Sequence, residues 1–256
     1  MSERILHSGS NQARVRLTPW DERAFGFRTA EILKIEGTDH LDPLIAMVDE
    51  WMTGEGVRYS FGRIGADAAT QRQSLQEAGY QFIETSLMVG RPRTEQWPRV
   101  PGSLQLHSSL AQSSHLDDLA RIGVEDFAHG RFLEDPTLDS DLAHLRTANW
   151  ISDLARNRQL HGISLNDTLV GFCADSIDAE THTANLILYG VSSRYPMLAL
   201  PLWINALQRL NQQGAKRYQA MLSAANVPVI NLYLKLGFQV VSTHFGFRKW
   251  HPNPHE

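Results

Sequence analysis

Apolar side chains recur with two different periods along this chain, and each period predicts a different kind of element. Alternating or short continuous apolar runs predict strands at 13–20, 27–35, 57–63 and 80–89. Apolar residues spaced three and four apart predict helices at 40–52 and 67–78. Gly79 then stands where a left-handed residue commonly ends a helix. The first third of the chain is therefore predicted to be a small domain of strands and helices.

The pattern changes at 91–102, where the sequence reads RPRTEQWPRVPG. Three prolines and no apolar period fit neither a helix interior nor a central strand. We therefore predict a linker at 92–102, with an accessory αβ domain at 13–91 before it and a second domain at 103–250 after it. The two ends, 1–12 and 251–256, are predicted to be flexible.

The second domain is predicted to begin with one strand and two helices, followed by three strands in succession and then by alternating helices and strands. Strands are predicted at 104–107, 160–165, 168–175, 184–191, 217–222 and 239–250, and helices at 113–126, 139–156, 196–213 and 227–236. Three successive strands form a meander, whereas the later alternation is typical of parallel crossovers. The sequence therefore predicts an α/β fold with a mixed central sheet and helices on both of its faces.

Composition excludes several classes of function. The chain has 24 Lys and Arg against 28 Asp and Glu, a net charge of −4, which argues against binding to a nucleic-acid backbone. It has no apolar stretch of about 20 residues, so no membrane partner is expected. The N-terminus carries no signal pattern, and a single cysteine, Cys173, fits a reducing compartment. We expect a cytoplasmic protein in which Cys173 is a small buried hydrophobic residue.

Catalytic and metal-binding motifs of other classes are missing from the sequence. There is no Gly-x-Ser-x-Gly elbow, phosphate-binding Walker loop or dinucleotide-binding Gly-x-Gly-x-x-Gly. The 11 histidines show no metal-ligand spacing, since even His251 and His255 are separated by prolines. No metal cofactor is therefore expected.

One segment near the C-terminus, 226–238, reads NVPVINLYLKLGF. By its residues alone it predicts a short helix that begins at an Asn cap and ends at Gly237. It resembles the closing motif of the GNAT superfamily of acyl-CoA-dependent N-acyltransferases, in which Asn opens a helix and Tyr-x-x-x-Gly-Phe ends it. The resemblance implies a GNAT-like acyltransferase domain that moves an acyl group, most simply acetyl, from a CoA thioester to a primary amine.

Two further segments narrow the resemblance. Residues 127–136 read FAHGRFLEDP, and residues 20–27 read WDERAFGF. Both are similar to segments of TDP-fucosamine acetyltransferase and related sugar N-acetyltransferases, whose members carry an extra N-terminal αβ domain. This narrower resemblance implies that the acceptor is an amino sugar of a nucleotide-sugar.

The resemblance to the superfamily also implies roles for individual residues. The pantetheine arm of acetyl-CoA would lie between the strands at 184–191 and 217–222, and a backbone amide among Gly190, Val191 and Ser192 would polarise the acyl carbonyl. Tyr233 would act as the general acid that protonates the leaving thiolate. Asn226 would contact the pantetheine, although it could equally be a plain helix cap.

The loop expected to bind pyrophosphate departs from the superfamily pattern, Gln/Arg-x-x-Gly-x-Gly/Ala. Residues 191–202 read VSSRYPMLALPL, without glycine, and Arg194 and Ala199 fit the spacing with Met197 in place of a glycine. Prolines also remove two amide donors. Three interpretations stay open: the loop holds CoA through its remaining amides and Arg194, the donor is an acyl carrier protein, or the protein is a catalytically inactive binding protein.

Candidate acceptor-binding residues lie near the start of the helix at 139–156. Arg131 could bind a diphosphate as a bidentate donor, and Glu134 could accept a proton from the attacking amine. The alternative is that these residues, with the aspartates beside them, form an ordinary solvated helix start. The expected partner is a small-molecule amine. For this fold, a homodimer that forms through the last strand is a further possibility.

Overall fold

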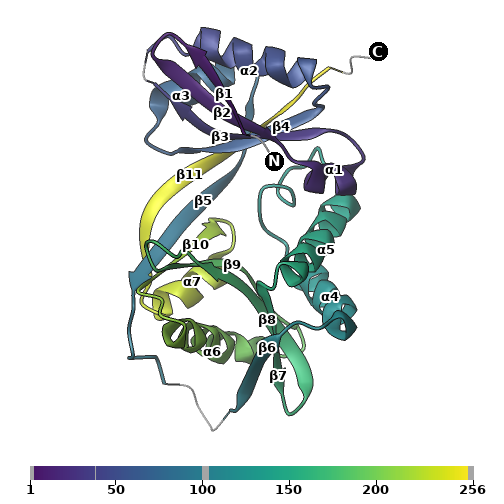
Figure 1. Ribbon diagram of the computed structural model, residues 1–256, viewed down its shortest axis with the longest axis vertical. Coiled ribbons are helices and arrows are strands. Elements are labelled where there is room, and N and C mark those ends of the chain that lie inside the picture. Colours follow the sequence, from purple (N-terminus) through teal and green to yellow (C-terminus); the bar gives the residue numbers. More distant parts are fainter. Residues whose placement is uncertain (1–2, 38, 100–103, 253–256) are drawn as a thin grey trace. The chain divides into compact units, whose positions relative to one another are not determined.

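A computed structural model describes residues 3–37, 39–99 and 104–252 (Figure 1). The chain divides into two compact units, and neither is continuous in sequence. Unit 1 comprises Met1–Ser86, Gly130–Arg146 and Ser242–Glu256, whereas unit 2 comprises Leu87–His129 and Thr147–Val241. Each unit is described separately below.

The sheet of unit 1 has the strand order β1-β2-β3-β4-β11-β5. Its strands are β1 (Arg4–Ser8), β2 (Asn11–Leu17), β3 (Thr29–Glu36), β4 (Tyr59–Gly65), the first half of β5 (Gln81–Pro92) and the end of β11 (Gln239–Trp250). Its helices are α1 (Pro19–Phe25), α2 (Asp42–Gly54), α3 (Ala69–Glu77) and the start of α5 (Ser140–Arg156). The last strand of the chain therefore belongs to the sheet that the first residues begin.

The strands of unit 2 follow the order β11-β5-β10-β9-β8-β7-β6. The strands not yet given are β6 (Leu106–Leu110), β7 (Leu160–Leu165), β8 (Thr168–Ile177), β9 (Thr183–Val191) and β10 (Arg217–Ser223). The helices are α4 (Leu116–Asp126), most of α5, α6 (Ala199–Gln212) and α7 (Val227–Lys235), with 3-10 turns η1 (Ser113–His115) and η2 (Pro196–Leu198). The predicted α/β class with a mixed sheet is confirmed.

Alternation along β8 shows how helices cover both faces of the unit 2 sheet. Phe172 and Ala174 pack with apolar residues of α4 and α5, whereas Cys173 packs with α6 and α7 on the other side. Successive side chains of a strand point to opposite faces, so the apolar run in β8 reflects burial on both. Cys173 is buried, as predicted.

The sequence-based division of the chain differs from these units. The predicted boundaries, 13–91 and 103–250, assign each strand to the domain nearest in sequence, whereas β5 and β11 each supply residues to both units. Pairing between strands far apart in sequence leaves no local signal, which explains the difference. The Pro-rich segment does separate β5 from β6, although residues 100–103 lie outside the described residues.

Both predicted flexible ends contain ordered residues. Arg4–Ser8 forms β1, which pairs with β2, so the expectation of a flexible segment at 1–12 is wrong there. At the other end His251 is buried, and its Nε2 lies 2.8 Å from Ser60 Oγ. Residues 253–256 lie outside the described residues. The helix α1 was also missed, because its apolar residues continue the pattern of the preceding strand.

The two units share one order of elements. Apart from α1 between β2 and β3 and η2 before α6, the order β1-β2-β3-α2-β4-α3-β5 recurs as β7-β8-β9-α6-β10-α7-β11. In each unit the third strand carries one residue more than its antiparallel neighbour: Leu33 in β3 and Ile187 in β9. Its parallel ladder to the fourth strand stops one residue before Leu33, at Ile32, and two residues before Ile187, at Asn185. The chain therefore contains two versions of one structural arrangement.

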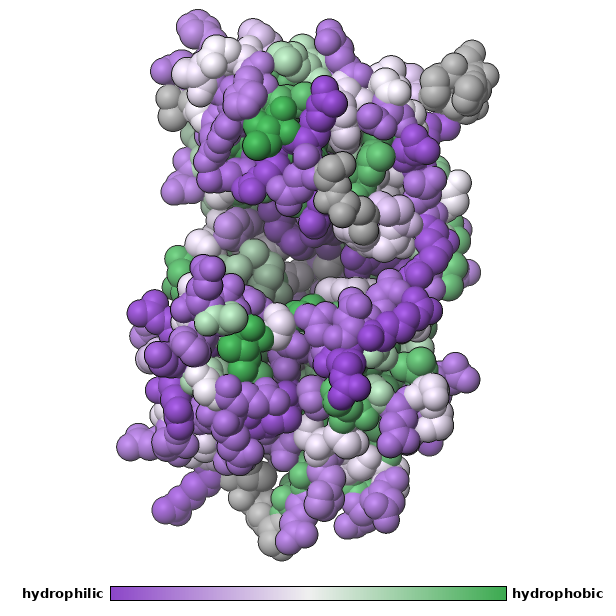
Figure 2. All heavy atoms as spheres, viewed as in Figure 1, coloured by the Kyte–Doolittle hydropathy of each residue, from purple (hydrophilic) through white to green (hydrophobic). Residues whose placement is uncertain are grey.

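The outer face of the molecule shown in Figure 2 is mainly hydrophilic, and apolar side chains form small separate groups on it. Single exposed apolar residues are normal on folded proteins. Within the described part of the chain, no helix has both the length and the apolar character that crossing a bilayer requires.

Gly62 tests the packing of unit 1. A Cβ there would lie 2.5 Å from the carbonyl oxygen of Ile32 and 2.7 Å from Phe247 Cζ. We expect Gly62→Ala to lower the free energy of unfolding by about 1–3 kcal/mol, since overpacking a buried site costs this much. Gly54→Ala is the matched control, because a Cβ at this residue of α2 meets nothing within 4 Å. Equal urea midpoints for the two variants would contradict the described packing.

Candidate functional site

In unit 2 the parallel strands β9 and β10 diverge. Their ladder joins Thr183–Asn185 to Arg217–Gln219, and both strands then continue, to Val191 and Ser223 (Figure 1). The extra residue of β9, Ile187, lies two residues beyond the end of the ladder at Asn185. An extra residue bends a strand and increases its twist, so the bulge accounts for the divergence. Backbone groups of β9 beyond it face an opening rather than a paired strand.

The hydrogen bonds between β8 and β9 identify which amides face this opening. The N–H of Ser192 donates to the carbonyl of Val170 at 2.8 Å, so it points toward β8. Direction alternates along a strand, and Gly190 therefore also points toward β8, whereas Val191 and Tyr189 point toward β10. Of the three predicted amides, that of Val191 is the one directed into the divergence.

Aromatic rings press against this part of β9. A Cβ at Gly190 would lie 2.8 Å from the ring of Phe172 and 3.4 Å from that of Phe127. The two rings stack with their centroids 6.2 Å apart. Only glycine leaves room for them, so the backbone beside Val191 is held between rings on one side and the divergence on the other.

The loop after β9 uses most of its amides internally. Tyr195 donates to Ser192 O at 2.7 Å, Leu198 donates to Tyr195 O at 2.9 Å, and Arg194 donates to Ser192 Oγ at 3.4 Å. Ala199 donates to the carbonyl of the first residue of η2, a proline. The side chain of Met197 is 72% exposed. Four amides that could approach a pyrophosphate are thus directed to protein acceptors, and the exposed Arg194 side chain is the cation beside them.

Helix α7 supplies Asn226 and Tyr233. Asn226 Oδ1 accepts the amide of Val229 at 3.3 Å, so the residue caps the helix. Tyr233 is 3% exposed and packs edge-on against Phe238 and Trp203, at centroid distances of 4.9 and 6.2 Å. Burial raises the pKa of Tyr233 well above its ordinary value. The phenol is therefore protonated at neutral pH.

Unit 1 has the same arrangement of strands and helices, but it has other residues at the positions of Asn226 and Tyr233. Helix α3 ends with a bond from Tyr80 N to Leu75 O at 2.9 Å, and α7 ends with the matching bond from Phe238 N to Tyr233 O at 3.0 Å. Leu75 therefore occupies the position of Tyr233. The residues that open the two helices are Ala68 and Asn226. Unit 1 thus has Leu75 and Ala68 at the positions where unit 2 has Tyr233 and Asn226.

The predicted acceptor residues lie in unit 1, whereas all the other candidates lie in unit 2. Arg131 pairs with Glu31 at 3.2 Å, and its guanidinium carbon lies 4.6 Å from the ring centroid of Phe61. Burial opposes ionisation of Glu31, but Arg131 and its neighbour Arg16 hold the pKa of that carboxyl below its ordinary value. Arg131 thus already has an anionic partner within its own unit.

Glu134 and the aspartates after it also make structural contacts. Glu134 Oε1 accepts the amide of Gly130 at 2.8 Å, and Asp139 Oδ1 accepts the amide of Asp141 at 2.8 Å near the start of α5. Asp135 is buried and accepts the hydroxyl of Tyr59 at 2.7 Å. Asp139 thus takes part in the helix start, whereas Asp135 is buried away from solvent, and an acceptor role for Arg131 and Glu134 stays a prediction. Metal-ligating residues do not gather in groups of three or more anywhere in the described ranges.

Sequence analysis missed a buried ion pair. Arg209 Nη2 lies 2.6 Å from Asp175 Oδ2, with side-chain exposures of 15% and 3%. The hydroxyl of Tyr189 donates to the same oxygen at 2.9 Å. Asp175 interrupts an apolar strand, and a charged residue inside such a run signals a buried charge that needs a partner. The sequence contained this signal, but it did not name the partner.

Comparison with known proteins bears on the fold. No protein-family model matches the chain, and no curated protein matches it. A GCN5-related N-acetyltransferase from Sphaerobacter thermophilus superposes with a TM-score of 0.63 at 14% identity, over 94% of this chain and 78% of that one. A tandem GNAT protein from the clavulanic acid biosynthesis pathway gives 0.61 at 13%, over 97% and 82%. This chain has the GNAT acetyltransferase fold.

A third match concerns a larger protein. A GCN5-related glucosamine N-acetyltransferase region in a fungal multi-domain GH3 β-N-acetylglucosaminidase gives a TM-score of 0.64 at 10% identity, over 93% of this chain and 31% of that one. The GNAT fold is thus found across matches whose sequences differ strongly from this one. At such identities the similarity establishes the architecture, and the chemistry must be argued from the residues.

Cys173 provides a test of the core beside this site. Burial, together with the charge of Asp175, raises the pKa of its thiol to about 12, which lowers the thiolate fraction about 1,000-fold relative to a thiol of pKa 9. We expect no reaction with Ellman's reagent in the native protein and one thiol per chain after unfolding in guanidinium chloride. Rapid reaction of the native protein would show that β8 is not buried as described.

Proposed function

We propose that the protein is an N-acyltransferase that moves an acetyl group from acetyl-CoA to a primary amine. One observation carries the proposal: β9 and β10 diverge after the bulge at Ile187, and the amide of Val191 faces the opening. An extended pantetheine arm can pair with such a strand edge as an added strand does. The GNAT fold supports this assignment.

The mechanism assigns separate tasks to backbone and side chain. The thioester supplies an activated acyl carbon, which the neutral amine attacks to form a C–N bond. The N–H of Val191 donates to the developing oxyanion. As the C–S bond breaks, Tyr233 transfers its proton to the departing thiolate. The proton that the amine nitrogen loses then restores the phenol, directly or through water.

Acetyl is the acyl group that we propose. The support is that solved structures with this fold include N-acetyltransferases.

For the acceptor we propose the amino sugar of a nucleotide-sugar. The support is the narrower sequence resemblance and the glucosamine N-acetyltransferase region that shares the fold. Arg131 would bind a diphosphate in this scheme, and Glu134 would take the proton of the ammonium form. Arg131 would have to exchange Glu31 for the ligand, so this assignment predicts a rearrangement on binding.

A second donor is favoured by the loop after β9. Because amides of that loop bond internally, it offers fewer donors to a pyrophosphate than the superfamily pattern supplies. An acyl carrier protein presents the same pantetheine arm with one phosphate and no nucleotide. A donor of this kind would place its pantetheine arm between β9 and β10, and it would need fewer amide donors from the loop because it has one phosphate.

The role of Tyr233 is tested by Tyr233→Phe. We expect kcat to fall about 100-fold or more, since a positioned proton donor contributes about 10²–10⁴-fold, while the melting temperature changes little. Tyr218→Phe is the matched control, because Tyr218 is also a buried tyrosine of this core but has no assigned role. A Tyr233→Phe enzyme as active as the Tyr218→Phe enzyme would remove the assignment.

Donor binding is tested by thermal shift with acetyl-CoA. A ligand at 100 times its Kd stabilises a fold by about 2.7 kcal/mol, so we expect a clear rise in melting temperature. Arg194→Gln should weaken binding about fivefold, whereas Arg217→Gln should not, since Arg217 lies at the paired end of the strands. Activity with an acylated carrier protein but no acetyl-CoA shift would select the second donor. If the protein shows neither an acetyl-CoA shift nor activity with an acylated carrier protein, it is a binding protein without catalysis.

A further inference from the structure

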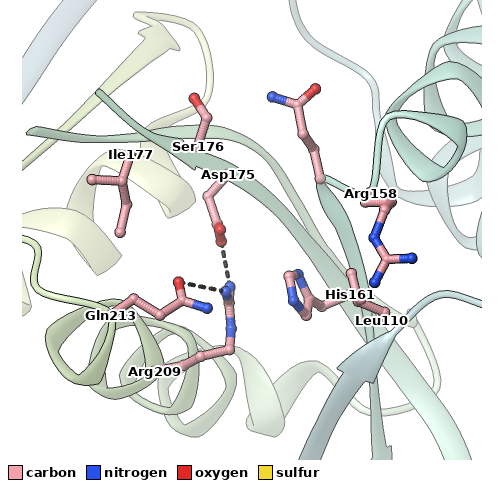
Figure 3. Close-up of a pocket in the computed structure, with 9 residues that line it drawn as sticks. Leu110, Arg158, His161, Asp175, Ser176, Ile177, Arg209 and Gln213 are labelled. Atoms are coloured by element: carbon pink, nitrogen blue, oxygen red, sulfur yellow. Dashed lines mark hydrogen bonds and ion pairs between the residues drawn. The ribbon is translucent and has the colours of Figure 1, made fainter. Parts of the chain in front are cut away.

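Unit 2 contains a pocket that the proposed reaction does not use (Figure 3). Its volume is about 400 Å³, within the range of small-molecule sites. It is lined by Leu110, Arg158, Gln159, His161, Asp175, Ser176, Ile177, Arg209 and Gln213. The antiparallel register places Asp175 opposite Leu186, on the other side of the bulge from Val191. The pocket is therefore distinct from the opening at the end of β9.

Arg209 forms the inner wall of this pocket. Its Nη2 is held by Asp175 at 2.6 Å, and its Nη1 contacts Gln213 Oε1 at 3.4 Å. Its Nε is buried and has no hydrogen-bond partner among the described residues. A buried donor without a partner costs free energy, and a bound acceptor would remove that cost.

His161 faces Arg209 across the pocket in Figure 3. Its Nδ1 is likewise buried without a hydrogen-bond partner among the described residues. Burial and the positive charge of Arg209 lower the pKa of His161, so the imidazole is neutral at pH 7 and one of its nitrogens is a donor. Two neighbouring side chains thus each leave a buried nitrogen without a partner.

Arg158 adds a second guanidinium at the rim. It follows α5 with a φ of 57°, a left-handed position that glycine or asparagine occupies at lower cost. Its side chain is exposed, lines the pocket, and makes no ion pair or hydrogen bond with the described residues. A cation is therefore available at the entrance.

We propose that this pocket binds a small organic monocarboxylate. Arg158 and Arg209 bring two positive charges and Asp175 one negative charge, so the lining carries a net charge of one that a single carboxylate balances. The carboxylate would lie against the guanidinium groups of Arg158 and Arg209 and the ring of His161. A side-chain movement on binding would bring it to Arg209 Nε, which is buried in this structure. Leu110 and Ile177 contact its hydrocarbon part.

The same charge balance argues against a phosphate dianion. Asp175 is fixed in place by Arg209 and by the hydroxyl of Tyr189, so its negative charge stays beside any bound anion. A dianion would meet this repulsion with one uncompensated charge. The apolar side chains Leu110 and Ile177 also offer nothing to the outer oxygens of a phosphate.

The test is an NMR titration of the full chain with butyrate, followed through the Nε–H signal of Arg209. We expect a saturable shift with a millimolar Kd, and none with butyramide, which has a similar shape without the charge. Arg158→Gln should weaken butyrate binding at least fivefold. Arg156→Gln is the matched control, since Arg156 is also exposed and pairs with Asp153 outside the pocket, and it should change Kd less than twofold.

Three results would overturn the proposal. The first is no saturable shift with butyrate, and the second is an equal loss of affinity in the two arginine variants, which would indicate general charge screening. The third is inorganic phosphate binding more tightly than butyrate at the same signal, which would replace the carboxylate with a different ligand. Arg158 and Arg156 are both exposed, so both variants should fold.

Discussion

The hydrogen-bond register between β8 and β9 is the constraint on which the candidate site depends. One extra residue, Ile187, shifts that register and bends β9 away from β10. Without the shift the two parallel strands would pair along their whole length, and the amide of Val191 would bond to β10. The opening therefore exists because a single residue has no counterpart on the neighbouring strand.

The same arrangement of strands and helices occurs in both units, but the side chains proposed for catalysis occur in unit 2 alone among the described residues. Unit 1 repeats the bulge and the shortened ladder at Leu33 and Ile32, yet Leu75 stands where unit 2 has Tyr233. The shared arrangement requires only a register shift, which many sequences allow, whereas proton donation requires one particular side chain. Under the proposed mechanism, fold and function are specified by different residues, which is the general rule for widely shared folds.

The sequence predicted most elements of unit 2, because their periods are clear and residues such as Gly237 mark their ends. It also predicted the closing helix with its Asn226 cap, since both depend on neighbouring residues. Pairing between distant strands could not be predicted, because it leaves no local pattern. The Asp175–Arg209 pair illustrates the same limit: burial of Asp175 could be inferred, but its partner is 34 residues away. The role of Arg131 and Glu134 could not be predicted either, because charged residues of the same kinds also occur at ordinary helix starts.

Strand β11 completes the sheet of unit 1, and this affects how the chain folds during synthesis. Strand β4 pairs with β11 from Tyr59–Trp250 to Gly65–His244, so the sheet of unit 1 needs residues that are synthesised after those of unit 2. Domains usually fold one after another from the N-terminus during synthesis. Here unit 1 is incomplete until β11 has been synthesised, and β4 presents an unpaired edge until then. Such an edge favours pairing with other chains, and aggregation of nascent protein is the hazard that this topology brings.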